Sequence, residues 1–151
     1  MIQSGPYLTS TMGNVMEPSG TGLSTRANNR PDWTGTSCGN LALDKRTVNA
    51  FWDRGAFVVP ASNMGRFGNA APGSLIGPMT RTLSIKIQKT FSITERLGLQ
   101  SEGLAANLTN LPNFGNPNGN ASVPQFGWIK STQGAENAGA RNLQVGLRVI
   151  F

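Results

Sequence analysis

The last eleven residues of the chain, 141–151, read RNLQVGLRVIF and alternate with a period of two. Small or polar residues, Asn142, Gln144, Gly146 and Arg148, separate the apolar ones. This period is typical of a β-strand with two different faces. The apolar face must lie against a protein core or against the hydrocarbon of a membrane. Five residues form it: Leu143, Val145, Leu147, Val149 and Phe151.

A second alternating segment, residues 82–94, has the sequence TLSIKIQKTFSIT. Lys89 is the one polar residue among its odd positions, and the even positions carry mostly Thr, Ser and Gln. A turn at 94–96 precedes another run with strand character at 97–110. We therefore predict a hairpin of two long strands. The apolar odd positions are Leu83, Ile85, Ile87, Phe91 and Ile93.

The rest of the chain is rich in turn-forming residues, with 19 Gly and 9 Pro in 151 residues. Residues 1–12 are compatible with a partial strand, and 13–78 read mostly as a long loop region. The segment 41–52 could form a helix, but a loop with a brief strand at 57–59 is favoured. Residues 111–125 are predicted to be a loop, and 126–131 a short β-like segment. Residues 79–151 therefore hold the C-terminal hairpin, a long loop and the terminal strand.

The connections alternate between long and short, and this pattern indicates a transmembrane β-barrel. Such barrels have short periplasmic turns, long extracellular loops and strands of about 9–11 residues. The predicted fold is all-β, an antiparallel meander of about four long strands with long loops, forming part of a larger barrel. If the 94–96 turn and the chain end are periplasmic, residues 13–78 are extracellular. A soluble, secreted β-rich binding or structural protein is the alternative.

No residue pattern for catalysis or metal binding is present. The chain has no histidine, so Ser-His-Asp and Cys-His triads and imidazole metal sites are excluded. Its acidic residues show neither metal-binding nor paired-carboxylate spacing. We therefore expect no enzyme and no catalytic, cofactor-binding or metal-binding residue. The acids are Glu17, Asp32, Asp44, Asp53, Glu95, Glu102 and Glu136.

The net charge of +6 does not indicate a nucleic-acid partner, because the basic residues are scattered. The single cysteine, Cys38, excludes an intramolecular disulfide. We find neither an apolar run long enough for a transmembrane helix nor the features of a signal peptide. Trp33, Trp52 and Trp128 fit either an interfacial aromatic girdle or the cores of loops.

Several segments, taken in order, resemble the C-terminal end of a known family. The chain is similar to TonB-dependent receptor-like barrels of the Oar type, which carry an N-terminal carboxypeptidase-regulatory-like domain. The likeness covers nearly the whole chain, although the 97–110 run has fewer aromatic residues than the family pattern. The segments are QSGPYLT, NRPD, FWDRGAFVVP, GRFGNAAPGSLIGP, LSIKIQKTFSITERLGLQ, NLTNLPNFGNPNGN, FGWIKST and ARNLQVGLRVIF.

This resemblance implies that the chain is a piece of a barrel of about 22 strands in the bacterial outer membrane. It implies three partners: outer-membrane lipid, the remainder of the parent barrel and the barrel-assembly machinery. In such barrels the terminal strand, with its final aromatic residue, is read as the assembly signal. The matching residues are Leu143, Val145, Leu147, Val149 and Phe151.

Overall fold

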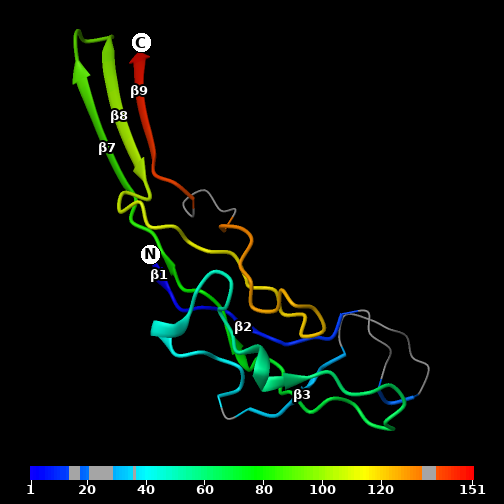
Figure 1. Cartoon of the computed structure of the whole chain (residues 1–151). Coiled ribbons are helices and arrows are strands. Elements are labelled where there is room, and N and C mark those ends of the chain that lie inside the picture. The colour runs from blue at the N-terminus through cyan, green and yellow to red at the C-terminus, as the bar shows by residue number, and fades with distance from the viewer. Residues whose placement is uncertain (14–17, 21–28, 36, 134–138) are drawn as a thin grey trace. The chain divides into compact units, whose positions relative to one another are not determined.

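The structure is a computed structural model that describes residues 1–13, 18–20, 29–35, 37–133 and 139–151 (Figure 1). Two of the acids considered above, Glu17 and Glu136, and part of the expected 13–78 loop lie outside these residues. The chain divides into two compact units. The first contains residues 1–4, 79–114 and 132–151, and the second contains 5–78 and 115–131.

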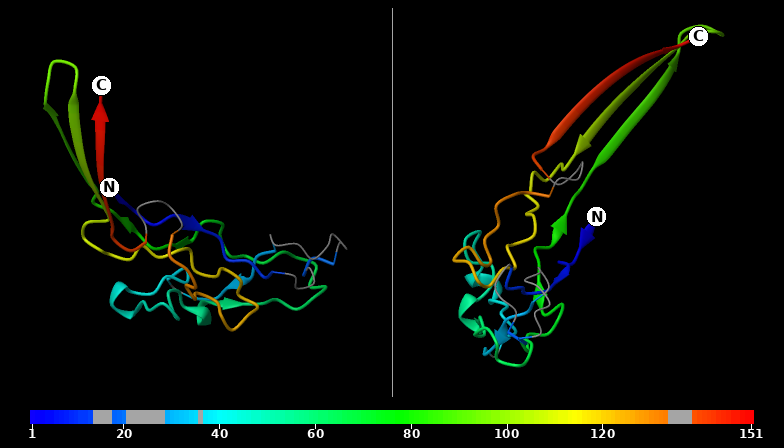
Figure 2. Two further views of the ribbon diagram at one scale, coloured as in Figure 1. Left: turned by 90° about the horizontal axis from the view of Figure 1, so that it is seen from above. Right: turned by 90° about the vertical axis from the view of Figure 1, so that its right-hand side faces the viewer.

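The first unit is built on a three-stranded antiparallel sheet in the order β7-β8-β9. The strands are β7 (Ile85–Ser92), β8 (Gly98–Ala106) and β9 (Asn142–Ile150). A tight turn joins β7 to β8, and it lies at the same end of the sheet as the C-terminus (Figures 1 and 2). The predicted all-β antiparallel meander is confirmed.

The expected strand at 1–12 is not one continuous strand. Its residues form β1 (Ile2–Gln3), which pairs with β6 (Thr80–Arg81) in the first unit, and β2 (Tyr7–Leu8) in the second. Pro6 lies between them and lacks the N–H that a sheet ladder requires. The sheet of long strands therefore has three strands, and β1 and β2 belong to two separate two-stranded sheets.

The second unit consists mainly of loops held by two short strand pairs. β2 pairs with β5 (Leu75–Ile76), and β3 (Asp32–Trp33) pairs with β4 (Phe57–Val58). The brief strand expected at 57–59 is therefore confirmed as β4. The only helical structure in residues 41–52 is the short 3₁₀ turn η1 (Leu43–Lys45), so the predicted loop is correct. A second 3₁₀ turn, η2 (Arg54–Ala56), is capped by the carboxylate of Asp53.

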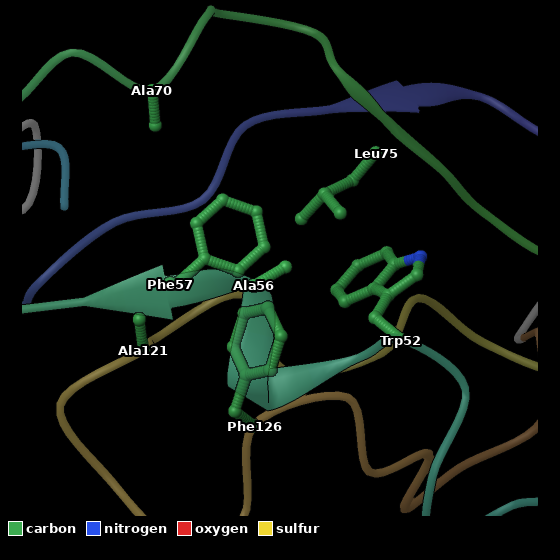
Figure 3. Packing of buried hydrophobic residues seen from close by; sticks show 7 residues of the cluster. All are labelled: Trp52, Ala56, Phe57, Ala70, Leu75, Ala121 and Phe126. Carbon is green, nitrogen blue, oxygen red and sulfur yellow. The ribbon is translucent and has the colours of Figure 1, made fainter. Parts of the chain in front are cut away.

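An aromatic core gives the second unit its packing (Figure 3). The ring of Phe126 lies 5.7 Å from that of Trp52 and 5.4 Å from that of Phe57, measured between centroids. The Trp52 indole donates to the Ile76 carbonyl at 2.9 Å, so its only polar group is satisfied. Trp52 therefore belongs to a loop core and not to a girdle. The core residues are Trp52, Ala56, Phe57, Ala70, Leu75, Ala121 and Phe126.

The expected β-like segment at 126–131 is wrong, because the chain turns there. Gly127 has a φ of +76°, which is accessible to glycine at little cost. A Cβ at this position would lie 3.0 Å from the backbone nitrogen of Trp52, and the Gly127 carbonyl accepts from Phe51 N–H. This segment thus forms a turn that packs against the core, and Phe126 is one of the core residues.

Candidate functional site

The register of the three long strands places most of their apolar residues on one face, while Leu104 and Ile150 lie on the other. Ile87 lies opposite Gly103, which lies opposite Val145, and Phe91 lies opposite Leu99, which lies opposite Val149. Side chains directly opposite one another across an antiparallel pair share a face. The predicted alternation of both segments therefore produces one common surface, here called the apolar face. It comprises Ile85, Ile87, Phe91, Leu99, Ala105, Leu143, Val145, Leu147 and Val149.

Much of the apolar face is open to its surroundings. Val145 is 87% exposed, and Ile87, Leu143 and Leu147 are each at least 66% exposed. Contiguous apolar surface of this kind is unusual for a soluble monomer and marks a contact with a membrane or another protein. Phe151 follows β9 at the same phase of the alternation and is 99% exposed. The sequence-predicted set of Leu143, Val145, Leu147, Val149 and Phe151 therefore lies along the exposed edge strand of this face.

The opposite face is polar and carries an ion pair. Lys86 Nζ lies 3.1 Å from Glu102 Oε2, and both side chains are about half exposed, so the pair contributes little stability. Glu102 lies opposite Gly146 in the register, and a Cβ on Gly146 would come within 3.0 Å of the Glu102 side chain. Glycine therefore leaves space for this carboxylate. The sequence pattern predicted the polar face but not this pair, which joins neighbouring strands.

Lys89 is the charged residue of β7 that shares the apolar face. It lies opposite Ser101, in the same row as Leu147. Its ammonium lies 5.0 Å from the centroid of the Phe91 ring, which is within the range of a cation–π contact. The aliphatic stem can cover apolar surface while the charged group reaches toward a more polar layer.

In the second unit, two of the segments that carry the family resemblance are joined by a clasp of hydrogen bonds. Arg66, in GRFGN, donates to both oxygens of Asp32, in NRPD, at 2.7 and 2.6 Å. Asn69 N–H donates to the same carboxylate at 3.1 Å, and the Asn69 side-chain oxygen accepts from Trp33 N–H at 2.7 Å. A Cβ on Gly68 would lie 1.9 Å from the Arg30 carbonyl oxygen, so this position requires glycine.

The clasp predicts a shifted titration of Asp32. Its pKa is lowered, mainly because the Arg66 guanidinium donates to its carboxylate. Since the folded pKa lies below the unfolded one, the stabilisation is present above the ordinary value of about 3.9 and is lost as the pH falls through the lowered folded pKa. An NMR titration of the Asp32 carboxyl should show this low midpoint, and Arg66→Gln should raise it. An unchanged midpoint in Arg66→Gln would contradict the assignment.

The remaining predicted residues lie apart from one another. Cys38 is exposed in the second unit and has a φ of +50°. Glu95 is exposed in the turn between β7 and β8. Within the described ranges, no group of three or more Cys, Asp or Glu side chains is arranged to hold a metal ion. The helical turns described are too short and too polar to span a bilayer.

The model of one protein family, the outer membrane beta barrel domain, matches residues 1–144. The chain belongs to this outer-membrane β-barrel domain family. The barrel domain is therefore a component of the bacterial outer membrane, and its exposed sheet is part of a barrel wall. The expected localisation is confirmed, and the secreted alternative is not supported. No curated protein and no solved structure matches the sequence.

Family membership explains the two faces of the sheet. In a membrane barrel the outward face is apolar and contacts lipid, whereas the inward face is polar and faces the lumen. The apolar face of β7, β8 and β9 corresponds to the first, and the face of Lys86 and Glu102 to the second. The strands of 8, 9 and 9 residues are close to the length that crosses an outer membrane.

Proposed function

We propose that this barrel domain is the C-terminal part of a TonB-dependent receptor-like outer-membrane protein of the Oar type. Its role would be structural and not catalytic: it supplies barrel wall, contacts outer-membrane lipid and joins the remainder of the parent barrel. The order of the resembling segments supports this proposal. So does the clasp between NRPD and GRFGN, because it gives two of those segments a shared structural task.

We also propose that the terminal strand is the segment read by the barrel-assembly machinery. The observation that carries this proposal is the exposure of Leu143, Val145 and Phe151 along a strand that pairs, among the described residues, only with β8. The other edge of β9 can therefore pair with a strand of another protein, while its alternate side chains enter apolar sites.

The receptor assignment is tested by the coding sequence upstream of Met1. The proposal predicts a continuous reading frame that encodes further alternating strands, a plug and a regulatory-like domain. A stop codon followed by a credible start site would contradict it. A continuous frame that encodes strands without a plug would keep the barrel and reject the receptor assignment.

The orientation of the barrel in the outer membrane can also be tested, because the native cysteine can be labelled without a further substitution. The tight β7–β8 turn and the C-terminus lie at one end of the sheet, which we take as periplasmic. Cys38, in the long region before β7, is then extracellular and exposed. A membrane-impermeant thiol reagent should label Cys38 on intact cells that produce the parent protein. In a Cys38→Ser background, Glu95→Cys should react only after the outer membrane is opened. The reverse pattern would overturn the topology.

A further inference from the structure

The free edge of β7 is the feature from which a new contact can be inferred. In the part of the chain that the structure describes, β7 pairs with β8 along its whole length and has no strand along its other edge (Figure 1). Such an edge presents unpaired backbone N–H and C=O groups and needs a partner within a barrel wall.

The hydrogen bonds on the β8 side fix the direction of the backbone groups of β7. Ile93 N–H donates to the Leu97 carbonyl at 2.8 Å, in line with the register that pairs Ser92 with Gly98. In an antiparallel strand, alternate residues direct both backbone groups to the same side. The odd-numbered residues of β7 therefore direct their backbone N–H and C=O groups toward β8. The even-numbered residues direct their backbone groups to the free edge, and these are Lys86, Gln88, Thr90 and Ser92.

The short ladder between β1 and β6 has the same phase. Thr82 N–H donates to the Met1 carbonyl at 2.9 Å, and the Met1 amino group donates to the Thr82 carbonyl. Ile2 lies opposite Arg81, and Gln3 opposite Thr80. The backbone groups of an even-numbered residue, Thr82, thus point toward β1, just as those of the even-numbered residues of β7 point toward the free edge. β1 and the free edge of β7 therefore lie on the same side of the continuous segment formed by β6 and β7.

We propose that the free edge of β7 receives the strand that leads directly into β1, which is the segment preceding Met1 in the parent barrel. This inference rests on the proposed function, since it requires a longer parent chain. Because β1 is antiparallel to β6, each step upstream of Met1 is one step forward along β7. Starting from Met1 opposite Thr82, the fifth residue before Met1 lies opposite Ile87, and the ninth lies opposite Phe91.

The register also assigns the faces of the incoming strand. Residues at odd distances before Met1 lie opposite Ile85, Ile87 and Phe91 and share the apolar face. Residues at even distances share the face of Lys86 and Gln88. The incoming strand is therefore expected to be apolar at the third, fifth and ninth positions before Met1 and polar at most even ones.

A disulfide scan of the parent protein in the outer membrane tests this register. Ile87 and the fifth residue before Met1 form a pair without mutual hydrogen bonds, in which the two Cβ atoms are close enough for a disulfide. Ile87→Cys, combined with cysteine at the fifth position in a Cys38→Ser background, should give an intramolecular disulfide on mild oxidation. The matched controls place cysteine at the fourth or the sixth position, where the side chain lies on the other face, and should give little.

The outcomes separate this inference from the proposed function. Preferential cross-linking at the third or seventh position in an inserted barrel would overturn the register but keep the parent-barrel assignment. A disulfide between two copies of Ile87→Cys would show that a second molecule occupies the edge and would also overturn the inference. Absence of upstream coding sequence would overturn both. Membrane insertion of the Ile87→Cys single variant, measured before oxidation, shows that the scan reports on a folded barrel.

Discussion

The Val145→Arg change is expected to destabilise the barrel domain in lipid by about 2–4 kcal/mol, the cost of a cation near the middle of a lipid-facing strand. Val145 lies near the middle of β9 on the apolar face and is 87% exposed. Gln144→Arg, one residue earlier, places the same group on the polar face, where water can solvate it, and should change stability by less than about 1 kcal/mol. Urea unfolding of the parent barrel in phospholipid vesicles measures both. Equal losses would contradict the assignment of the faces.

The Phe151→Ser change is expected to remove most of the parent protein from the outer membrane, while Ile150→Ser leaves most of it there. Phe151 continues the alternation of Leu147 and Val149, whereas Ile150 lies opposite Gly98 on the polar face. If the assembly machinery reads alternate side chains of an edge strand, only the first change removes a recognised group. Quantification of the protein in outer-membrane fractions tests this. Equal loss for both variants would show that general hydrophobicity, and not alternation, is recognised.

The long strands could be predicted from the sequence because a period of two is a local signal. The 82–94 run contains β7, and the terminal run contains β9. β8 was less distinct, because Ala105, Ala106 and Gly103 blur its pattern, yet it forms in the expected hairpin. β8 forms because it pairs with a strand on each side, and this pairing stabilises it although its side-chain pattern is weak.

The contacts of the loop region could not be predicted, because they join residues distant in sequence. Asp32 and Arg66 are 34 residues apart, and neither segment shows by itself that it needs the other. The same holds for the core that Phe126 forms with Trp52 and Phe57. The position of Pro6 did carry a usable signal: a proline within residues 1–12 argues against one continuous paired strand, and the structure divides there.

We assign one face of β7, β8 and β9 to contact with lipid and the other to the barrel lumen. Quenching by brominated lipids tests this assignment most directly, with a small fluorophore attached at Leu147→Cys or at Arg148→Cys in the parent barrel, in a Cys38→Ser background. Leu147 lies on the apolar face, and Arg148 lies opposite Gln100 on the polar face. The assignment predicts strong quenching at position 147 and little at 148. Equal quenching, or stronger quenching at 148, would contradict it.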